Sequence, residues 1–350
     1  MDVAHCYLDG NADAVEFCPH DSMHNILAAA TYTLQEHQQP TRVGSITLFN
    51  LDPDAGQLES LHHVATAGIF DIKWNPVGGA NHGPVLAQAD AEGCLRLYRL
   101  QRSDEQDGAV EALKEASHKS ISSSSMCLCL DWDPSSSAIS VGLSDGSVSI
   151  LSLEESQPQV QHEWKPHDFE VWATSFDLHQ PQLVYTGSDD CKFCCRDLRD
   201  SPGKLTFQNT RDHKMGVCCI AKSPGHANLV HTGSYDEHLR VWDLRLMSKP
   251  INQTGAWLGG GVWRIKPHPM AWGLVLAACM HNGFAVVDLK EAEANVIERY
   301  SKHGSLAYGG DWMRGRSCWG SKTNGPVVAT CSFYDRMLRL WIPKATTLLA

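Results

Sequence analysis

The sequence predicts an all-β protein folded as a seven-bladed β-propeller, and three observations support this fold class. Two segments of the same pattern, His167–Arg199 and His213–Arg245, follow one another, and the second ends just after the pair Trp242-Asp243. The pattern recurs along the chain to give seven repeats at intervals of about 50 residues, close to the length of one four-stranded blade. Short apolar runs alternate with Gly, Asp and Asn turns, which favours strands, and helical periodicity is absent.

The Trp-Asp pair is typical of WD repeats, and it fixes the alignment of the other repeats. Asp236 lies six residues before Trp242, and an Asp holds the same position in three further repeats. The repeats are expected to end near Leu51, Leu100, Leu153, Arg199, Arg245, Leu289 and Ile342. Because seven blades are enough to close a ring, we expect residues 1–350 to form a single WD-repeat propeller domain.

Ring closure needs a specific device, because an open ring would leave a strand edge unpaired. The segment Asp2–Leu8 precedes the inner strand of the first repeat, so we expect it to supply the outer strand of the last blade. Three charged or Ser-rich stretches are expected to be inter-strand loops. They are Gln35–Arg42, Gln101–Ser125 and Lys290–His303.

Composition excludes several classes of protein. The net charge is −11, from 29 Lys and Arg against 40 Asp and Glu, which argues against a nucleic-acid partner. No apolar run reaches the roughly 18 residues that a membrane span requires, and the N-terminus lacks the basic region of a signal peptide. The 13 cysteines show no zinc-binding spacing. We therefore expect reduced, buried thiols, no metal and a cytoplasmic location.

Three histidines near the starts of repeats are expected to bond the turn Asp of their own repeat and so to hold the blade together. Buried networks of this kind are structural rather than catalytic. The expected pairs are His167 with Asp190, His213 with Asp236 and His303 with Asp335.

The sixth repeat departs from this pattern. Its turn, Ala278–Phe284, carries His281 where four other repeats have Asp, and Val287 stands at the Trp position. Positions that break a local rule are candidates for function. The alternative is a degenerate repeat with an exposed His.

One rim of the predicted ring gathers aromatic residues, mainly from repeats four to seven. The expected rim residues are Glu170, Trp172, Met215, Gly216, Tyr235, Gly260, Trp263, His281, Asn282, Tyr308, Phe333 and Tyr334. Asp71, Arg264 and Asp311 lie on predicted inner strands and are expected to line the channel. The alternative for any one aromatic residue is packing between blades.

Two repeats end in Asp-x-Arg, at Arg196–Arg199 and Trp242–Arg245. This ending resembles the box by which some WD proteins attach to the adaptor of a cullin-type ubiquitin ligase. The alternative is an exposed Arg at a strand end that only improves solubility.

Several longer stretches together resemble the diphthine methyltransferase family of WD-repeat proteins. They are Gly233–Arg245, Gly260–Pro269, Leu276–Phe284, Tyr308–Trp312 and Ala329–Asp335. Despite its older name, this family is held to hydrolyse a methyl ester. The resemblance implies removal of one methyl group from methylated diphthine on translation elongation factor 2, which releases methanol and diphthine before the final amidation to diphthamide. It implies no external cofactor.

The implied substrate carries a trimethylammonium group beside its ester, and aromatic faces with nearby acids hold such cations. We expect the substrate cage to be drawn from Glu170, Trp172, Tyr235, Trp263, Tyr308 and Tyr334. We expect His281 to act as general base on water or on Cys279, with Asp311 orienting the imidazole. Two other functions stay open: a non-catalytic scaffold, including a ubiquitin-ligase substrate receptor, and a reader of the modified factor.

Overall fold

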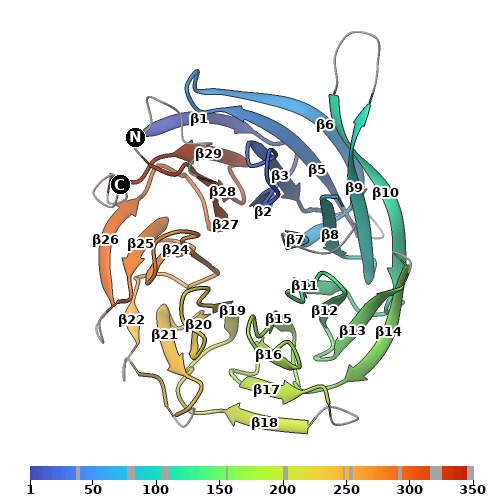
Figure 1. The fold of residues 1–350 in the computed structure, drawn as a ribbon, viewed down its shortest axis with the longest axis vertical. Coiled ribbons are helices and arrows are strands. Elements are labelled where there is room, and N and C mark those ends of the chain that lie inside the picture. The colour runs from blue at the N-terminus through green and yellow to red at the C-terminus, as the bar shows by residue number, and fades with distance from the viewer. Residues whose placement is uncertain are drawn as a thin grey trace.

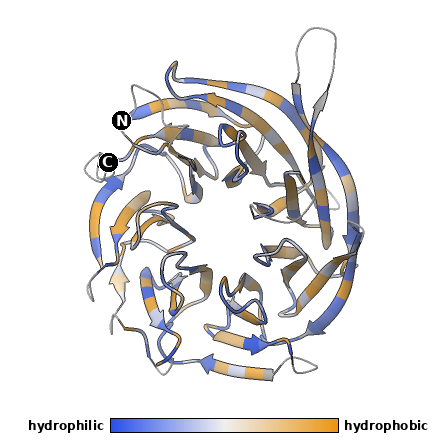
Figure 2. Ribbon diagram, viewed as in Figure 1, coloured by the Kyte–Doolittle hydropathy of each residue, from blue (hydrophilic) through white to orange (hydrophobic). Residues whose placement is uncertain are grey.

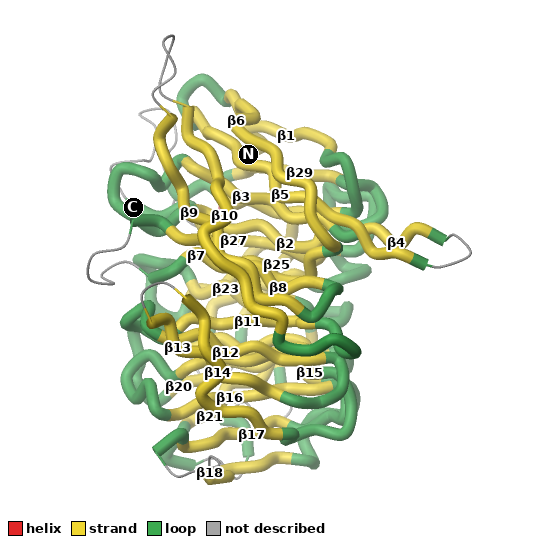
Figure 3. Tube along the Cα trace, turned by 90° about the vertical axis from the view of Figure 1, so that its right-hand side faces the viewer, coloured by secondary structure: helices red, strands yellow, loops and turns green. Residues whose placement is uncertain are grey.

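The computed structural model describes residues 1–36, 40–76, 83–103, 110–154, 157–199, 204–246, 249–251, 255–290, 294–315 and 325–344. These residues form seven antiparallel sheets arranged as blades around a central channel, which confirms the predicted β-propeller (Figure 1). The strands run across the thickness of the ring, so that the loops gather at its two faces (Figure 3). No helix in the described ranges is long and apolar enough to cross a membrane.

Each blade starts with its inner strand, and the strands follow one another outward. Blade 1 comprises β2 (Ala12–Phe17), β3 (Ile26–Thr31), β5 (Thr41–Asp52) and β6 (Gln57–Ala67), with the short β4 (Thr33–Gln35) beside β5. Blade 2 comprises β7 (Ile69–Trp74), β8 (Val85–Asp90), β9 (Cys94–Ser103) and β10 (Val110–Ser120). Blade 3 comprises β11 (Cys127–Trp132), β12 (Ala138–Leu143), β13 (Val148–Glu154) and β14 (Gln157–Trp164).

The remaining blades follow the same plan. Blade 4 comprises β15 (Val171–Phe176), β16 (Leu183–Ser188), β17 (Phe193–Asp197) and β18 (Lys204–Asn209). Blade 5 comprises β19 (Val217–Lys222), β20 (Leu229–Ser234), β21 (His238–Asp243) and β22 (Ala256–Trp257). Blade 6 comprises β23 (Arg264–Pro267), β24 (Leu274–Ala278), β25 (Phe284–Asp288) and β26 (Asn295–Tyr300). Blade 7 comprises β27 (Ala307–Trp312), β28 (Val328–Ser332), β29 (Met337–Trp341) and, from the other end of the chain, β1 (Asp2–Tyr7).

The ring closes through β1, which pairs antiparallel with β29 and confirms the expected role of Asp2–Leu8. The register runs from Asp2 opposite Trp341 to Tyr7 opposite Met337. Backbone hydrogen bonds continue beyond both ends of the strand, from Ile342 to Met1 at 2.8 Å and from Leu8 to Arg336 at 2.8 Å. Closure therefore rests on main-chain pairing between the two ends of the sequence.

The prediction that two charged stretches are loops was wrong. Residues 101–125 contain β10, and residues 290–303 contain β26, each the outermost strand of its blade. Exposed and less exposed residues alternate along β26 because one face packs on the blade and the other meets solvent. Figure 2 shows the same mixture of hydrophilic and hydrophobic residues along the outer strands. Polar residues at alternate positions concealed the strand pattern in the sequence. The third stretch, Gln35–Arg42, includes residues 37–39, which lie outside the described ranges.

The histidine networks hold the second and third strands together, but only one of the three expected pairs is direct. His167 Nδ1 lies 3.0 Å from Asp190 Oδ1, which confirms that pair. His213 instead contacts Arg240, and Arg240 binds Asp236 at 2.9 Å.

The third pair is relayed by a serine, because His303 Nδ1 contacts Ser332 Oγ, which donates to Asp335. In blades 5 and 7 the second histidine nitrogen meets a threonine hydroxyl, and the buried indole of Trp242 or Trp341 donates to that same hydroxyl. Burial lowers the pKa of His303 to about 4, so this imidazole is neutral and serves structure.

Deleting residues 1–8 should destabilise the whole ring. The deletion removes the β29 pairing and the packing of Val3, Ala4 and Cys6 against the core shared by blades 7 and 1. Several ladder hydrogen bonds at about 1 kcal/mol each, with this packing, predict a loss of more than about 3 kcal/mol in the free energy of unfolding. Urea unfolding measures it. Tyr7→Ser, which changes an exposed side chain of the same strand, is the control and should change stability by less than about 0.5 kcal/mol. A deletion variant as stable as the control would contradict the proposed closure.

Candidate functional site

The inner strands share a β-bulge at one end of the channel. The register shifts between Ala12 and Ala14, Ile69 and Asp71, Cys127 and Cys129, Val171 and Ala173, Val217 and Cys219, and Ala307 and Gly310. In blade 6 the equivalent residue is Trp263, immediately before β23. Val262 lies against Gly233 of blade 5 as Val171 lies against Gly142 of blade 3, so the residue after each of these valines holds the same position. A bulge leaves one residue unpaired and re-aims its side chain. The blades thus present one extra residue each around the channel mouth.

An aromatic collar surrounds this mouth, and it consists of Tyr32, Phe70, Trp172, Tyr235, Trp263, Tyr308 and Phe333. Trp263 is its centre: its ring centroid lies 5.4 Å from that of Trp172, 5.8 Å from Tyr235 and 4.8 Å from Tyr308. The contacts continue from Tyr308 to Phe333 at 5.1 Å, to Tyr32 at 6.1 Å and to Phe70 at 4.9 Å. All but Phe333 are half-buried, so the rings are in contact yet remain partly open to the mouth.

The structure brings together four of the aromatic residues expected to form the cage, namely Trp172, Tyr235, Trp263 and Tyr308. Tyr334 lies at the edge and is 69% exposed, with its ring against Phe333. Tyr32 and Phe70 were not predicted from the sequence. Tyr32 follows β3 as Tyr235 follows β20 and Phe333 follows β28, so aligning the ends of the second strands could have found it.

Two acids flank the collar beside Trp172. The backbone amide of Asp189 donates to the carbonyl of Glu170 at 3.0 Å, which places these residues side by side. Burial and the charge of Glu170 raise the pKa of Asp189. Glu170 was expected from the sequence, and Asp189 was not.

Below the collar, a buried ion pair spans the channel between blades that are not neighbours. Arg264 on β23 donates to Asp71 on β7 at 3.0 Å, and the second oxygen of Asp71 accepts the backbone amide of Leu130 at 3.2 Å. Asp71 and Arg264 line a cavity of about 170 Å³ that also meets Trp172 and Cys218. Both residues therefore lie where the sequence analysis expected channel-lining groups.

Asp13, the bulge residue of blade 1, is a buried acid close enough to this ion pair to interact with both of its charges. It is only 4% exposed, and its Oδ1 has no hydrogen-bond partner among the described residues. Burial raises the pKa of Asp13 to about 8, and Asp71 adds to the rise while Arg264 opposes it. Sequence reasoning had no signal for this residue, since a single Asp between alanines has no recognisable motif.

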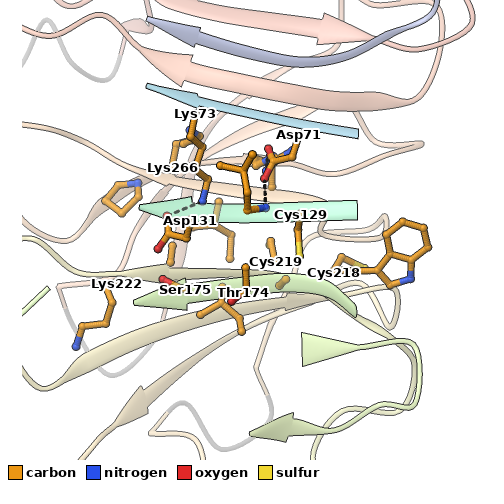
Figure 4. Close-up of a pocket in the computed structure, with 18 of the residues that line it drawn as sticks. Asp71, Lys73, Cys129, Asp131, Thr174, Ser175, Cys218, Cys219, Lys222 and Lys266 are labelled. Carbon is orange, nitrogen blue, oxygen red and sulfur yellow. Dashed lines mark hydrogen bonds and ion pairs between the residues drawn. The ribbon is translucent and has the colours of Figure 1, made fainter. Parts of the chain in front are cut away.

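Deeper in the channel, lysines pair with carboxylates that also tie neighbouring blades together. Lys73 binds Asp131 at 2.8 Å, and Asp131 accepts the backbone amide of Phe176 at 2.9 Å. Lys266 binds Glu16 and lies 3.7 Å from Asp311. Figure 4 shows Asp71, Lys73, Asp131 and Lys266 around the cavity. These charges are already paired, which suits a structural role at this depth.

The three residues expected to form the catalytic centre are not brought together. Cys279 is completely buried in the core between blades 5 and 6, and burial raises the pKa of its thiol to about 12. A protonated thiol without solvent contact cannot attack a substrate. Asp311 accepts the backbone amide of Phe17 at 2.9 Å and so joins blades 7 and 1 instead of orienting an imidazole. His281 is exposed on the turn between β24 and β25.

A metal-binding arrangement is offered only by Asp90, Glu92 and Cys94 within the described ranges. Arg96 already binds Asp90 at 2.8 Å and Glu92 at 2.7 Å. The set therefore fits a salt-bridged turn better than a cation site.

The Asp-x-Arg endings of blades 4 and 5 place their arginines on the surface. Arg199 pairs with Asp197 and Arg245 with Asp243, at 2.5 and 2.6 Å. Attachment to a ubiquitin-ligase adaptor stays a prediction.

Comparisons with known proteins agree with this architecture. The family model described as WD domain, G-beta repeat matches residues 205–243. Human diphthine methyltransferase is 35% identical over 334 residues, which cover 86% of this chain and 72% of the relative. The diphthine methyltransferase homolog of Dictyostelium discoideum is 32% identical and covers 96% of this chain and 98% of its own. A chain in the crystal structure of the mitotic checkpoint complex has a TM-score of 0.72 at 15% identity, covering 97% of this chain and 90% of its own, which shows the fold alone.

Replacing Asp13 with Asn should stabilise the protein, increasingly so as pH rises. The folded protein retains a proton that the unfolded chain loses above the ordinary Asp pKa of 3.8. Wild-type stability therefore falls by about 1.4 kcal/mol per pH unit from this group until the pH reaches the folded-state pKa of about 8. Asn does not titrate, so the difference in unfolding free energy between Asp13→Asn and the wild type, measured by urea unfolding, should grow between about pH 5 and about pH 7. A difference in unfolding free energy that does not change with pH would contradict the buried position of the carboxyl.

Proposed function

This chain belongs to the diphthine methyltransferase family of WD-repeat proteins, and on that premise we propose that it is a methyl esterase acting on methylated diphthine. Its substrate is translation elongation factor 2 with this modification, and its products are methanol and diphthine. The aromatic collar is the observation that carries the proposal, because it suits the trimethylammonium group that stands beside the ester.

The collar provides what a quaternary ammonium ion needs. Such a cation cannot donate hydrogen bonds, so its recognition depends on aromatic faces and on nearby negative charge. The rings of Trp172, Trp263 and Tyr308 supply the faces. Glu170 and Asp189 supply the charge beside Trp172. Each ring contact with a partly desolvated cation contributes roughly 1 kcal/mol.

A cation held in the collar brings the ester close to the channel mouth. In the proposed substrate both groups are attached to one carbon, so the ester lies only a few bonds from the trimethylammonium group. Ester hydrolysis then requires a base for water and donors for the developing oxyanion. The indole N–H of Trp263 is buried and has no partner among the described residues, which makes it a candidate donor.

The decisive experiment is single-turnover methanol release. Purified protein is mixed with elongation factor 2 that carries methylated diphthine, without any added cofactor, and mass spectrometry follows the loss of one methylene mass. We expect release at a rate that depends on the amount of protein. Tight binding without release would instead favour a reader or a scaffold, and His281→Ala in the same assay tests the base expected from the sequence.

Removing two collar rings should weaken substrate binding. Two contacts of about 1 kcal/mol each predict that Trp172→Ala/Trp263→Ala raises KM by about 30-fold. Trp257→Ala is the matched control, because this Trp is 63% exposed on β22 and lies outside the collar. Equal KM values for the double variant and the control would overturn the cage.

A further inference from the structure

The bulge position of the seven inner strands forms a ring at the channel mouth, and one member differs in kind. The members are Asp13, Phe70, Leu128, Trp172, Cys218, Trp263 and Tyr308. Six are apolar or aromatic, and only Asp13 is a carboxylate. Because six blades fill this position without an acid, the packing of the ring does not require one.

We propose that Asp13 is the general base that activates water in the esterase site. This inference rests on the proposed function and adds the catalytic residue to it. Asp13 holds the same bulge position as Trp172 and Tyr308 of the collar, and its Oδ1 is buried without a partner in the described part of the chain. A buried polar atom left unsatisfied is costly, and such costs are retained mainly at functional sites.

The surroundings of Asp13 keep the carboxylate available. Arg264 on β23 is the nearby cation, and it is already engaged by Asp71 on β7. Asp13 also interacts electrostatically with three other titratable groups. They are Tyr235 after β20, Tyr308 on β27 and Cys331 on β28. Burial raises the pKa of each of these three well above its ordinary value, so at neutral pH they are uncharged. Asp13 is thus the group in this set whose proton can move at neutral pH.

The reaction balances with water as the sole co-reactant. The Asp13 carboxylate takes a proton from water as the water oxygen bonds to the ester carbonyl carbon, and negative charge develops on the carbonyl oxygen. As the bond to the methoxy oxygen breaks, Asp13 returns the proton to that oxygen and methanol leaves. The product acid ionises, and the carboxylate of Asp13 is restored.

The substrate itself prepares the base. Burial raises the pKa of Asp13 to about 8, so most of the free protein carries the carboxyl in its neutral form at pH 7. A trimethylammonium group seated in the collar favours the charged form and lowers this pKa, because opposite charges stabilise each other in a poorly solvated site. The base is therefore formed when a cationic ester is bound, and an uncharged methyl ester of the same shape should react slowly.

The test compares Asp13→Asn with the wild type in the methanol-release assay. We expect kcat to fall at least about 100-fold, as is usual on loss of a general base. Binding of the modified factor should stay within a few-fold, and the unfolding midpoint should not fall. Asp21→Asn is the matched control, since the Asp21 side chain is 98% exposed, and it should retain wild-type turnover.

The pH profile gives a readout that a structural role would not move. In the wild type, kcat/KM should rise as pH approaches about 8, because the free protein must lose the Asp13 proton. The rise in kcat should occur at lower pH, since the bound cation lowers that pKa. The Asp13→Asn variant should show neither the rise in kcat/KM nor the rise in kcat.

Two outcomes separate the proposals from each other. If the wild type releases no methanol, the esterase itself is wrong. If the wild type is active and Asp13→Asn keeps its turnover and pH profile, only the role of Asp13 is wrong. Should the Asn variant fold poorly, Asp13→Ala with added formate replaces it: formate should restore turnover and formamide should not, and equal effects of the two would overturn the inference.

Discussion

The main-chain pairing of β1 with β29 is the interaction on which the rest of the structure depends. It holds blade 7 against blade 1, and the two meet so closely that a Cβ on Gly309 would lie 2.9 Å from the backbone nitrogen of Val15. Asp13 from blade 1 reaches Tyr308 and Cys331 of blade 7 only because this contact exists. Phe333 meets Tyr32 across the same boundary. The contacts of the site across this boundary therefore depend on the closure of the ring.

The repeated β-bulge explains how a fold made of similar blades obtains a dissimilar site. A bulge at the same place in each inner strand turns one side chain toward the mouth without changing the blade around it. Sequence variation at that single position then sets the chemistry of the mouth. This position is aromatic on blades 2, 4, 6 and 7, and it is an acid on blade 1. Outside this ring, channel charges such as Lys73 and Asp131 are paired and bind blade to blade.

The sequence predicted the fold well, because each repeat carries its own strands and turns. It erred at β10 and β26, where one-sided burial produces charged alternation that resembles a loop. For the site it identified Trp172, Tyr235, Trp263 and Tyr308, since large aromatics near strand starts and turns are visible in the repeat alignment. It could not show that Cys279 is enclosed between blades or that Arg240 and Ser332 relay two histidine networks. Those facts depend on contacts between segments, which a repeat pattern does not encode.

Selectivity follows from the collar and the buried acid acting together. An aromatic collar alone would hold any quaternary ammonium ion, whether or not it carried an ester. A carboxyl whose pKa burial has raised to about 8 is mostly protonated at neutral pH, and alone it is a poor base. A cation in the collar supplies the charge that ionises the acid, so binding energy at one group is converted into reactivity at its neighbour. The destabilisation that an unpartnered Asp13 imposes on the free protein is then relieved by the substrate. This coupling is the physical reason for an acid at a position where six other blades have none.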